Sequence, residues 1–149
     1  MYEMTDIILA ADHGGVALKE KIKEYLREKK YFFIDVGTSS PDIKVDYPLI
    51  VKEGVDCVLS SKSFGGIFIC KSGIGVSIAA NRHKGIRAAL CRTPAEAKIG
   101  REHGDINVLC LGAEGAEWEN VKKIVNAFLT TKPSLEERYI RRQKQLDSI

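Results

Sequence analysis

The sequence predicts an α/β fold of three layers, in which helices cover both faces of a five-stranded, mainly parallel sheet. Five short apolar runs alternate with amphipathic segments along the chain, and a βαβ series of this kind gives a parallel sheet with helices on both faces. The 149 residues also suit a single domain, which we expect to span residues 1–149.

Local patterns justify the elements one by one. Leu18, Ile22 and Leu26 recur every four residues on one face of the first helix, and Pro48 suits the first turn of the second. The run at residues 67–70 lacks polar alternation, as expected of a strand covered on both faces. In chain order the expected elements are strand 7–11, helix 19–30, strand 32–36, helix 48–61, strand 67–70, helix 75–82, strand 86–90, helix 93–103, strand 108–111, helix 117–129 and helix 134–146.

Two later helices carry capping patterns at their starts. Thr93 stands at the N-cap, Pro94 at the first helical position and Glu96 at the third, and we expect Gly104 to take the left-handed position after that helix. Residues 134–137 repeat the capping-box pattern and open a final basic helix. Together the elements predict a three-layer αβα, Rossmann-like fold, in which ligands bind beyond the carboxyl ends of the strands.

Composition excludes several classes of function. The net charge of +3 is too small to indicate a nucleic-acid or membrane partner, and no apolar stretch approaches the ~20 residues needed to span a bilayer. The first residues show no signal peptide. Cys57, Cys70, Cys91 and Cys110 form no Cys-x-x-Cys pair and have no histidines at metal spacing, so we expect no metal site and a reducing cytoplasm.

Polar residues follow the first strand directly. Asp12 and His13 precede two glycines at a helix start, where an acid and an imidazole could engage a polar ligand. Alternatively, Asp12 only caps the helix and His13 is solvated. These residues alone leave both interpretations open.

The third strand ends at a glycine loop that opens with Cys70. Gly73 and Gly75 allow a tight turn that aims backbone N–H groups at an anion, and the following helix adds its positive end. A cysteine at this point gains thiolate character, whereas the other three cysteines are best explained as buried core residues. The loop is neither a thiol-phosphatase loop, because Val76 stands where the arginine would be, nor a P-loop.

Late in the chain, three cationic side chains are further candidates. Arg138 and Arg142 lie four residues apart on one helix, so both could hold one phosphate. Without other information a solvated helix face is the better explanation, and His103 is equally explained by a helix dipole.

Considered in order, these motifs resemble the family of type B ribose-5-phosphate isomerase and galactose-6-phosphate isomerase. The resemblance covers nearly the whole chain, and the cysteine loop with its continuation is its most specific part. The motifs are Asp12-His13-Gly14, Gly37-Thr38, Asp46-Tyr47-Pro48, Cys70-x-Ser72-Gly73-x-Gly75, Ser77-Ile78-Ala79-Ala80-Asn81, Gly85-Ile86-Arg87-Ala88, Arg101-x-His103, Asn107-Val108-Leu109 and Arg138-x-x-x-Arg142.

The resemblance implies an aldose–ketose phosphate isomerase of the pentose phosphate pathway. It would convert ribose 5-phosphate to ribulose 5-phosphate through an enediolate, without metal or cofactor. Cys70 would be the base, Ser72 would supply a hydroxyl where the family usually has threonine, and Asp12 and His103 would open the sugar ring. The implied substrate and phosphate contacts are His13, Tyr47, Lys71, Gly73, Ile74, Gly75, Asn81, Arg138 and Arg142, with the amides of residues 71–75 forming an anion hole.

The resemblance also implies a homodimer, or a dimer of dimers, with active sites shared between subunits. The final helix, residues 134–147, would then pack on a partner subunit. This arrangement would explain how His103, Arg138 and Arg142 reach Cys70.

Three departures from the family pattern concern the substrate side. Gly104 replaces the usual asparagine, Glu114 replaces an arginine found in many members, and Tyr139 replaces a histidine; the Gly-Gly that precedes this histidine is also missing. Two alternatives therefore stay open: a six-carbon substrate such as galactose or allose 6-phosphate, or a weakly active sugar-phosphate sensor. The retention of Cys70 and Ser72 favours an enzyme.

Overall fold

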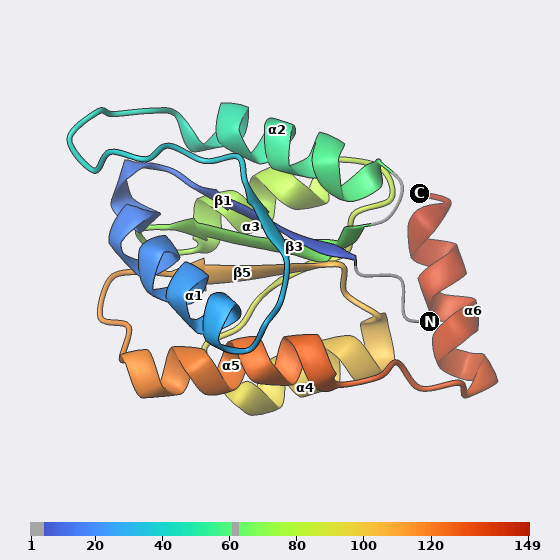
Figure 1. Cartoon of the computed structure of the whole chain (residues 1–149). Helices are drawn as coiled ribbons and strands as arrows, with labels where there is room; N and C mark the ends of the chain where they lie inside the picture. The colour runs from blue at the N-terminus through green and yellow to red at the C-terminus, as the bar shows by residue number, and fades with distance from the viewer. Residues whose placement is uncertain (1–4, 61–62) are drawn as a thin grey trace.

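A single sheet lies between two layers of helices in the computed structural model of the chain (Figure 1), which describes residues 5–60 and 63–149. Its strand order is β2-β1-β3-β5-β4, and every described strand pair is parallel. The predicted three-layer α/β fold is confirmed. The strands are β1 (Asp6–Ala11), β2 (Phe33–Asp35), β3 (Ser63–Cys70), β4 (Ala88–Leu90) and β5 (Val108–Gly112).

Two apolar clusters, one on each face of the sheet, form the core. Helices α1, α4 and α5 cover one face, while α2 and α3 cover the other. None of the described helices is long and apolar enough to cross a membrane. The helices are α1 (Val16–Glu28), α2 (Tyr47–Leu59), α3 (Ile74–Asn81), α4 (Pro94–Gly104), α5 (Trp118–Thr130) and α6 (Glu137–Asp147), and a 3₁₀ turn spans His13–Gly15.

Element types agree with the sequence predictions, and most boundaries agree within three residues. The predicted capping box of α4 is present, since Thr93 and Glu96 exchange side-chain and backbone bonds. Strand β3 begins four residues earlier than predicted, because the chain remains paired through Gly65 and Gly66. The predicted second helix extended to residue 61, which lies outside the described residues; α2 ends at Leu59.

Two predicted helix caps are wrong. Gly104 is still helical, and Asp105 takes the left-handed position with φ of 42°, a conformation that aspartate tolerates better than most residues. The Asp105 carboxylate accepts a hydrogen bond from Arg101 at 2.7 Å, which favours this geometry. Ser134 caps a turn before α6 by accepting from the Glu136 amide, so the helix itself begins only at Glu137.

The topology creates a crevice at one end of the sheet. Helix α1 leaves β1 toward one face, whereas α3 leaves the neighbouring β3 toward the other. A crevice therefore opens beyond the carboxyl ends of β1 and β3, where open α/β sheets bind their ligands. Helix α6 lies at the opposite end, where β1 and β3 begin (Figure 1).

Candidate active site

Cys70 ends β3 and begins the glycine loop as predicted. Its side chain is almost buried, with 5% of the residue exposed, and its Sγ accepts a hydrogen bond from the Gly73 amide at 3.1 Å. Gly73 adopts φ of +78°, and a Cβ there would lie 2.8 Å from the Gly112 amide nitrogen. Glycine is therefore required to turn its N–H toward the sulfur, and this bond fixes the position of the Cys70 side chain.

Ser72 and Tyr47 complete the surroundings of this loop. The Ser72 Oγ accepts from the Ile74 amide at 3.1 Å, which leaves the hydroxyl hydrogen available to donate. A Cβ on Gly75 would lie 2.7 Å from the ring of Tyr47, so the ring covers the backbone of the loop. Two of the five amides expected to form an anion hole, those of Gly73 and Ile74, donate to side chains of the loop itself.

The turn after β1 lies beside the same loop. Asp12 is buried and accepts from the Gly14 amide at 3.0 Å, so it does cap the 3₁₀ turn. A Cβ on Gly14 would lie 3.4 Å from Lys71, which places the capping turn next to the cysteine loop. The two interpretations of Asp12 are therefore compatible: one carboxylate oxygen caps the turn while the residue borders the crevice.

His13 is half-buried rather than simply solvated. Its Nδ1 accepts a hydrogen bond from the Val45 amide at 3.2 Å. In a neutral imidazole, the hydrogen then belongs to Nε2. The Nε2–H group can donate to an anionic ligand.

Glu114, one of the departures from the family pattern, also borders the loop. Its amide donates to the Lys71 carbonyl at 2.9 Å, and its Oε1 lies 3.7 Å from the Lys71 Nζ. Both side chains are exposed. The two opposite charges partly neutralise each other at the rim of the loop.

His103 lies at the other end of the sheet from Cys70. Helix α4 runs back from the end of β4 to the start of β5, so its last residue lies about 15 Å from its first. The His103 ring stacks on Tyr139 of α6, with centroids 4.3 Å apart and planes 7° from parallel, and the Gln143 Nε2 donates to the His103 carbonyl. The structure thus brings His103 to α6 and not to Cys70 of the same chain.

The two arginines of α6 share this separation from Cys70. Arg138 donates to Glu136 at 2.9 Å and to the Tyr139 hydroxyl at 2.9 Å, and its guanidinium lies over the Tyr139 ring. Arg142 is exposed. Both arginines therefore belong to a second group of candidate residues, which with His103 we call the α6 group.

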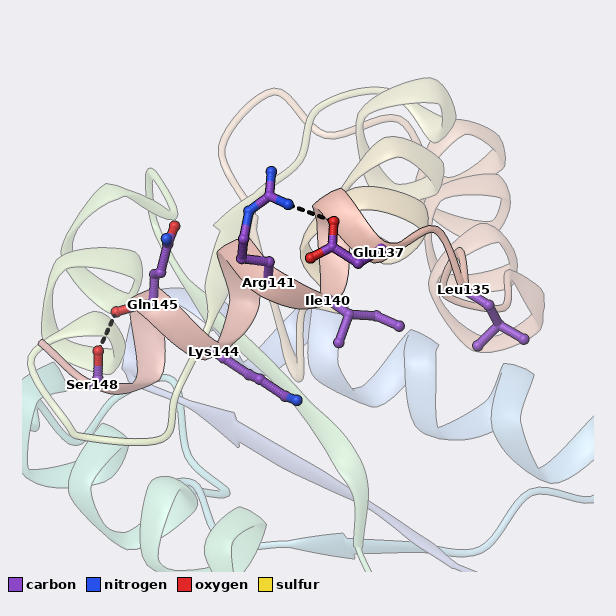
Figure 2. Close-up of a pocket in the computed structure, with 7 residues that line it drawn as sticks. All are labelled: Leu135, Glu137, Ile140, Arg141, Lys144, Gln145 and Ser148. Carbon is purple, nitrogen blue, oxygen red and sulfur yellow. Dashed lines mark hydrogen bonds and ion pairs between the residues drawn. The ribbon is translucent and has the colours of Figure 1, made fainter.

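A hollow of about 490 Å³ lies beside α6 (Figure 2). It contains none of the predicted site residues. Arg141 pairs with Glu137 on one side of α6, whereas Ile140 and Lys144 extend from the other side of the helix. The hollow is lined by Leu135, Glu137, Ile140, Arg141, Lys144, Gln145 and Ser148.

Asn81 is occupied within the chain. Its Nδ2 donates to the Ala88 carbonyl at 2.9 Å, and its Oδ1 accepts from the Ala88 amide at 2.8 Å. Both halves of the amide group therefore join the end of α3 to β4, and α3 carries the residue away from the Cys70 loop.

A family model described as Ribose/Galactose Isomerase matches residues 7–146. The chain belongs to this family. Ribose-5-phosphate isomerase B of Escherichia coli is 40% identical over 126 residues, which cover 85% of this chain and 84% of that protein. A ribose 5-phosphate isomerase structure from Thermotoga maritima has a TM-score of 0.93 at 41% identity and covers 99% of this chain and 100% of that chain. Ribose-5-phosphate isomerase B of Clostridium thermocellum has a TM-score of 0.91 at 36% identity, with 96% and 95% covered.

The other cysteines of this isomerase differ from Cys70 in their surroundings. Burial, with a smaller contribution from Glu96, raises the pKa of Cys91 to about 11, and burial also raises the pKa of Cys110. Both therefore stay neutral near pH 7, as expected of core residues. Cys57 was predicted to be a buried core residue, but it is only half-buried. Among the described residues, no cluster of three His, Cys, Asp or Glu side chains could hold a metal ion.

Sequence reasoning missed one fully buried and one half-buried cation of the isomerase fold. Lys19 is fully buried on α1, and Arg87 binds carbonyls at the end of α4 as well as Asp147 of α6. The spacing of Lys19 could have revealed its burial. It lies three residues before Ile22 and seven before Leu26, which places it on the buried face of the same helix.

Proposed function

We propose that the chain interconverts ribose 5-phosphate and ribulose 5-phosphate through an enediolate, with Cys70 as the base. The observation that carries this proposal is the 3.1 Å hydrogen bond from the Gly73 amide to the Cys70 sulfur. The backbone donor holds the sulfur at the tip of the strand, and proton abstraction beside a carbonyl requires a base fixed in this way. The names of the relatives from Escherichia coli and Thermotoga maritima support the choice of sugar.

In the proposed reaction, the Cys70 thiolate removes the C2 proton of the open-chain aldose. The C–H electron pair forms the C1=C2 bond, and the carbonyl pair moves to O1. A proton then passes from O2 to O1, and the Cys70 thiol returns its proton to C1, so atoms and charge balance. The Ser72 hydroxyl and the loop amides stabilise the oxygen charge, and a well-placed donor of this type contributes about 3–4 kcal/mol in other enzymes.

Substrate binding in this proposal uses both groups of residues. The Nε2–H of His13 together with Arg138 and Arg142 holds the phosphate, and Asp12 with His103 opens the furanose ring. Tyr47 contacts the sugar from its position over Gly75. The Asn81 amide supports the site indirectly, through the joint between α3 and β4.

Because the two groups lie at opposite ends of one sheet, we propose a homodimer whose sites each combine the Cys70 loop of one chain with the α6 group of the other. Leu49, Ile74 and Ile78 support this, since they are 67%, 48% and 57% exposed on α2 and α3 beside the Cys70 loop. Such apolar surface is typical of an interface. Leu135 and Ile140 border the hollow on α6 (Figure 2) and suit a partner chain in the same way. A dimer of dimers is compatible with the same surfaces.

The departures from the family pattern bear on affinity in this proposal. Lys71 lies 3.7 Å from Glu114 and reduces the repulsion between that carboxylate and a phosphate. Tyr139 retains a ring stacked on His103 where the family has histidine. A six-carbon aldose phosphate remains the alternative substrate. The proposal places the enzyme in the cytoplasm, where its four free cysteines stay reduced.

The test is turnover of ribose 5-phosphate in deuterated water, with galactose 6-phosphate and allose 6-phosphate assayed in parallel. We expect ribulose 5-phosphate carrying deuterium at C1 and, after the reverse reaction, ribose 5-phosphate carrying deuterium at C2. Cys70→Ala should lower kcat by about 10²–10⁴-fold, the usual contribution of a general base. Cys57→Ala, a cysteine outside the site, serves as the matched control. Full activity of Cys70→Ala would rule out the proposed base, and faster turnover of a six-carbon sugar would overturn the substrate.

A further inference from the structure

Lys19 is a fully buried charge that the proposed mechanism does not use. Its side chain has no exposed surface, and its Nζ lies 2.8 Å from the Asp35 Oδ1. The same Nζ donates to the Thr38 carbonyl. Burying an ammonium group is costly unless it is paired and hydrogen-bonded, so both contacts are required for Lys19 to remain inside.

Asp35 connects this lysine to the loop that follows β2. Its Oδ1 also accepts from the Gly37 amide at 3.1 Å, and its Oδ2 accepts from Lys23 at 3.1 Å. Burial alone would raise the pKa of the Asp35 carboxyl, but the hydrogen bonds from Lys19 and Lys23 outweigh it and hold that pKa below its usual value. The carboxylate therefore stays charged at neutral pH.

The first residues of this loop lie directly against the strand that leads to Asp12. The Thr38 amide donates to the Ala11 carbonyl at 3.2 Å. A Cβ on Gly37 would come within 2.5 Å of the Ala11 nitrogen. The Lys19–Asp35 pair thus holds Gly37 and Thr38 at the tip of β1, next to the proposed active site.

The other end of the same loop reaches two proposed substrate contacts. The Val45 amide donates to the His13 Nδ1 at 3.2 Å, and Tyr47, two residues later, lies over Gly75. In Figure 1 the cyan segment between β2 and α2 extends past the tip of β1 before it returns to α2. The loop over residues 36–46 is therefore attached at both ends to the active-site crevice.

We infer that Lys19 is a positioning residue: through Asp35 and Thr38 it holds the 36–46 loop so that Val45 orients His13 and Tyr47 covers Gly75. The kinetic consequence rests on the proposed function, because it assumes that His13 and Tyr47 contact the sugar phosphate. The effect of Lys19 on the position of the loop is independent of the proposed function. A purely structural lysine would stabilise the fold without changing the orientation of the His13 ring.

The test compares Lys19→Met, which keeps an unbranched side chain but removes the ammonium group, with Lys21→Met on the exposed face of the same helix. For Lys19→Met we expect KM for ribose 5-phosphate to rise about tenfold with little change in kcat, because phosphate contacts are weakened while Cys70 is untouched. Amide exchange at Thr38 and Val45 should accelerate by about tenfold or more. Nitrogen NMR should show the His13 ring losing its preference for hydrogen on Nε2. Lys21→Met should leave all three unchanged.

A lower melting temperature with unchanged KM, unchanged exchange at Val45 and an unchanged His13 tautomer would overturn the inference. If Lys19→Met does not fold, Gly37→Ala displaces the same loop from the β1 side, because its Cβ cannot approach Ala11 so closely. That variant should show the same three changes, and their absence would equally overturn the inference. Exchange and NMR need no substrate, so they remain decisive even if the wild type proves inactive on ribose 5-phosphate.

Discussion

The two ends of the sheet differ in how their candidate residues are held. At the carboxyl end, Cys70 is almost buried and bound by a backbone amide, in a loop whose glycines are required by close contacts. At the other end, the α6 group is exposed, and helix α6 contains no buried residue. Side-chain bonds and one ring stack attach this helix to the rest of its own chain.

This difference matches the two proposed roles, in which the Cys70 loop transfers the proton and the α6 group binds the substrate. A proton-transfer base must be positioned to a fraction of an ångström, and the loop between β3 and α3 of one chain provides that rigidity. A short helix without a fully buried residue is only marginally stable by itself. Under the proposed function it becomes ordered where it is needed, against a second chain. The α6 group is then a contribution to the partner's site rather than an incomplete part of its own.

The strongest test of this comparison pairs two inactive variants. Chains carrying Cys70→Ala and chains carrying Arg142→Ala are co-expressed with different tags, and the mixed dimer is purified through both. One of its two sites then combines an intact Cys70 loop with an intact α6 group, so we expect about half of the wild-type activity from two nearly inactive parents.

Each variant purified as its own homodimer is the control for this mixture and should stay nearly inactive. A mixed dimer no more active than its parents would show that each site is built from a single chain. The proposed sharing would then be wrong, whatever the identity of the base.

A smaller effect is expected from glycines that differ in their surroundings. Gly73 and Gly115 both have positive φ, +78° and +71°, but a Cβ would clash at Gly73 and meets nothing within 4 Å at Gly115. Gly115→Ala should therefore lower the free energy of unfolding by only about 1 kcal/mol. Gly73→Ala should also lower kcat by about 10²-fold, because it displaces the amide that donates to Cys70. Urea unfolding measures the change in stability, and steady-state kinetics measure the change in kcat. Equal kcat values for the two variants would contradict the role of the Gly73 amide.

The fold was predictable because its signals are local. Apolar runs and a helix face such as Leu18, Ile22 and Leu26 are set by residues close in sequence, and so is the capping box of Thr93 and Glu96. The errors occurred where a distant partner decides the conformation. Asp105 takes the left-handed position with the help of Arg101.

The site was only partly predictable for the same reason. Cys70 could be singled out by its place between a strand and a glycine loop, and the structure gives it the expected backbone donor. His103 and the arginines of α6 were indicated only by resemblance to a family, since their spacing equally suits a solvated helix. Lys19 was missed because its partner Asp35 lies on β2, and only the folded chain brings α1 and β2 together.

The smallest expected effect concerns the attachment of α6 to its own chain. Arg87 donates to both oxygens of Asp147 at 2.8 Å, with 16% and 43% of the two side chains exposed. A double-mutant cycle with Arg87→Gln and Asp147→Asn should give a coupling energy of about 1 kcal/mol, the upper range for a partly exposed pair. The exposed Lys52–Asp56 pair of α2, 2.9 Å apart, is the matched comparison and should give about 0.3–0.5 kcal/mol. Urea unfolding yields both coupling energies. Amide exchange should show that α6 opens faster when Asp147 is replaced by asparagine, and that it is unaffected when the Lys52–Asp56 pair is broken. If the Arg87–Asp147 coupling is no larger than that of Lys52–Asp56, the pair adds nothing special to the attachment of α6. The anchors would then be the stack of Tyr139 on His103 and the hydrogen bond from Gln143 to the His103 carbonyl.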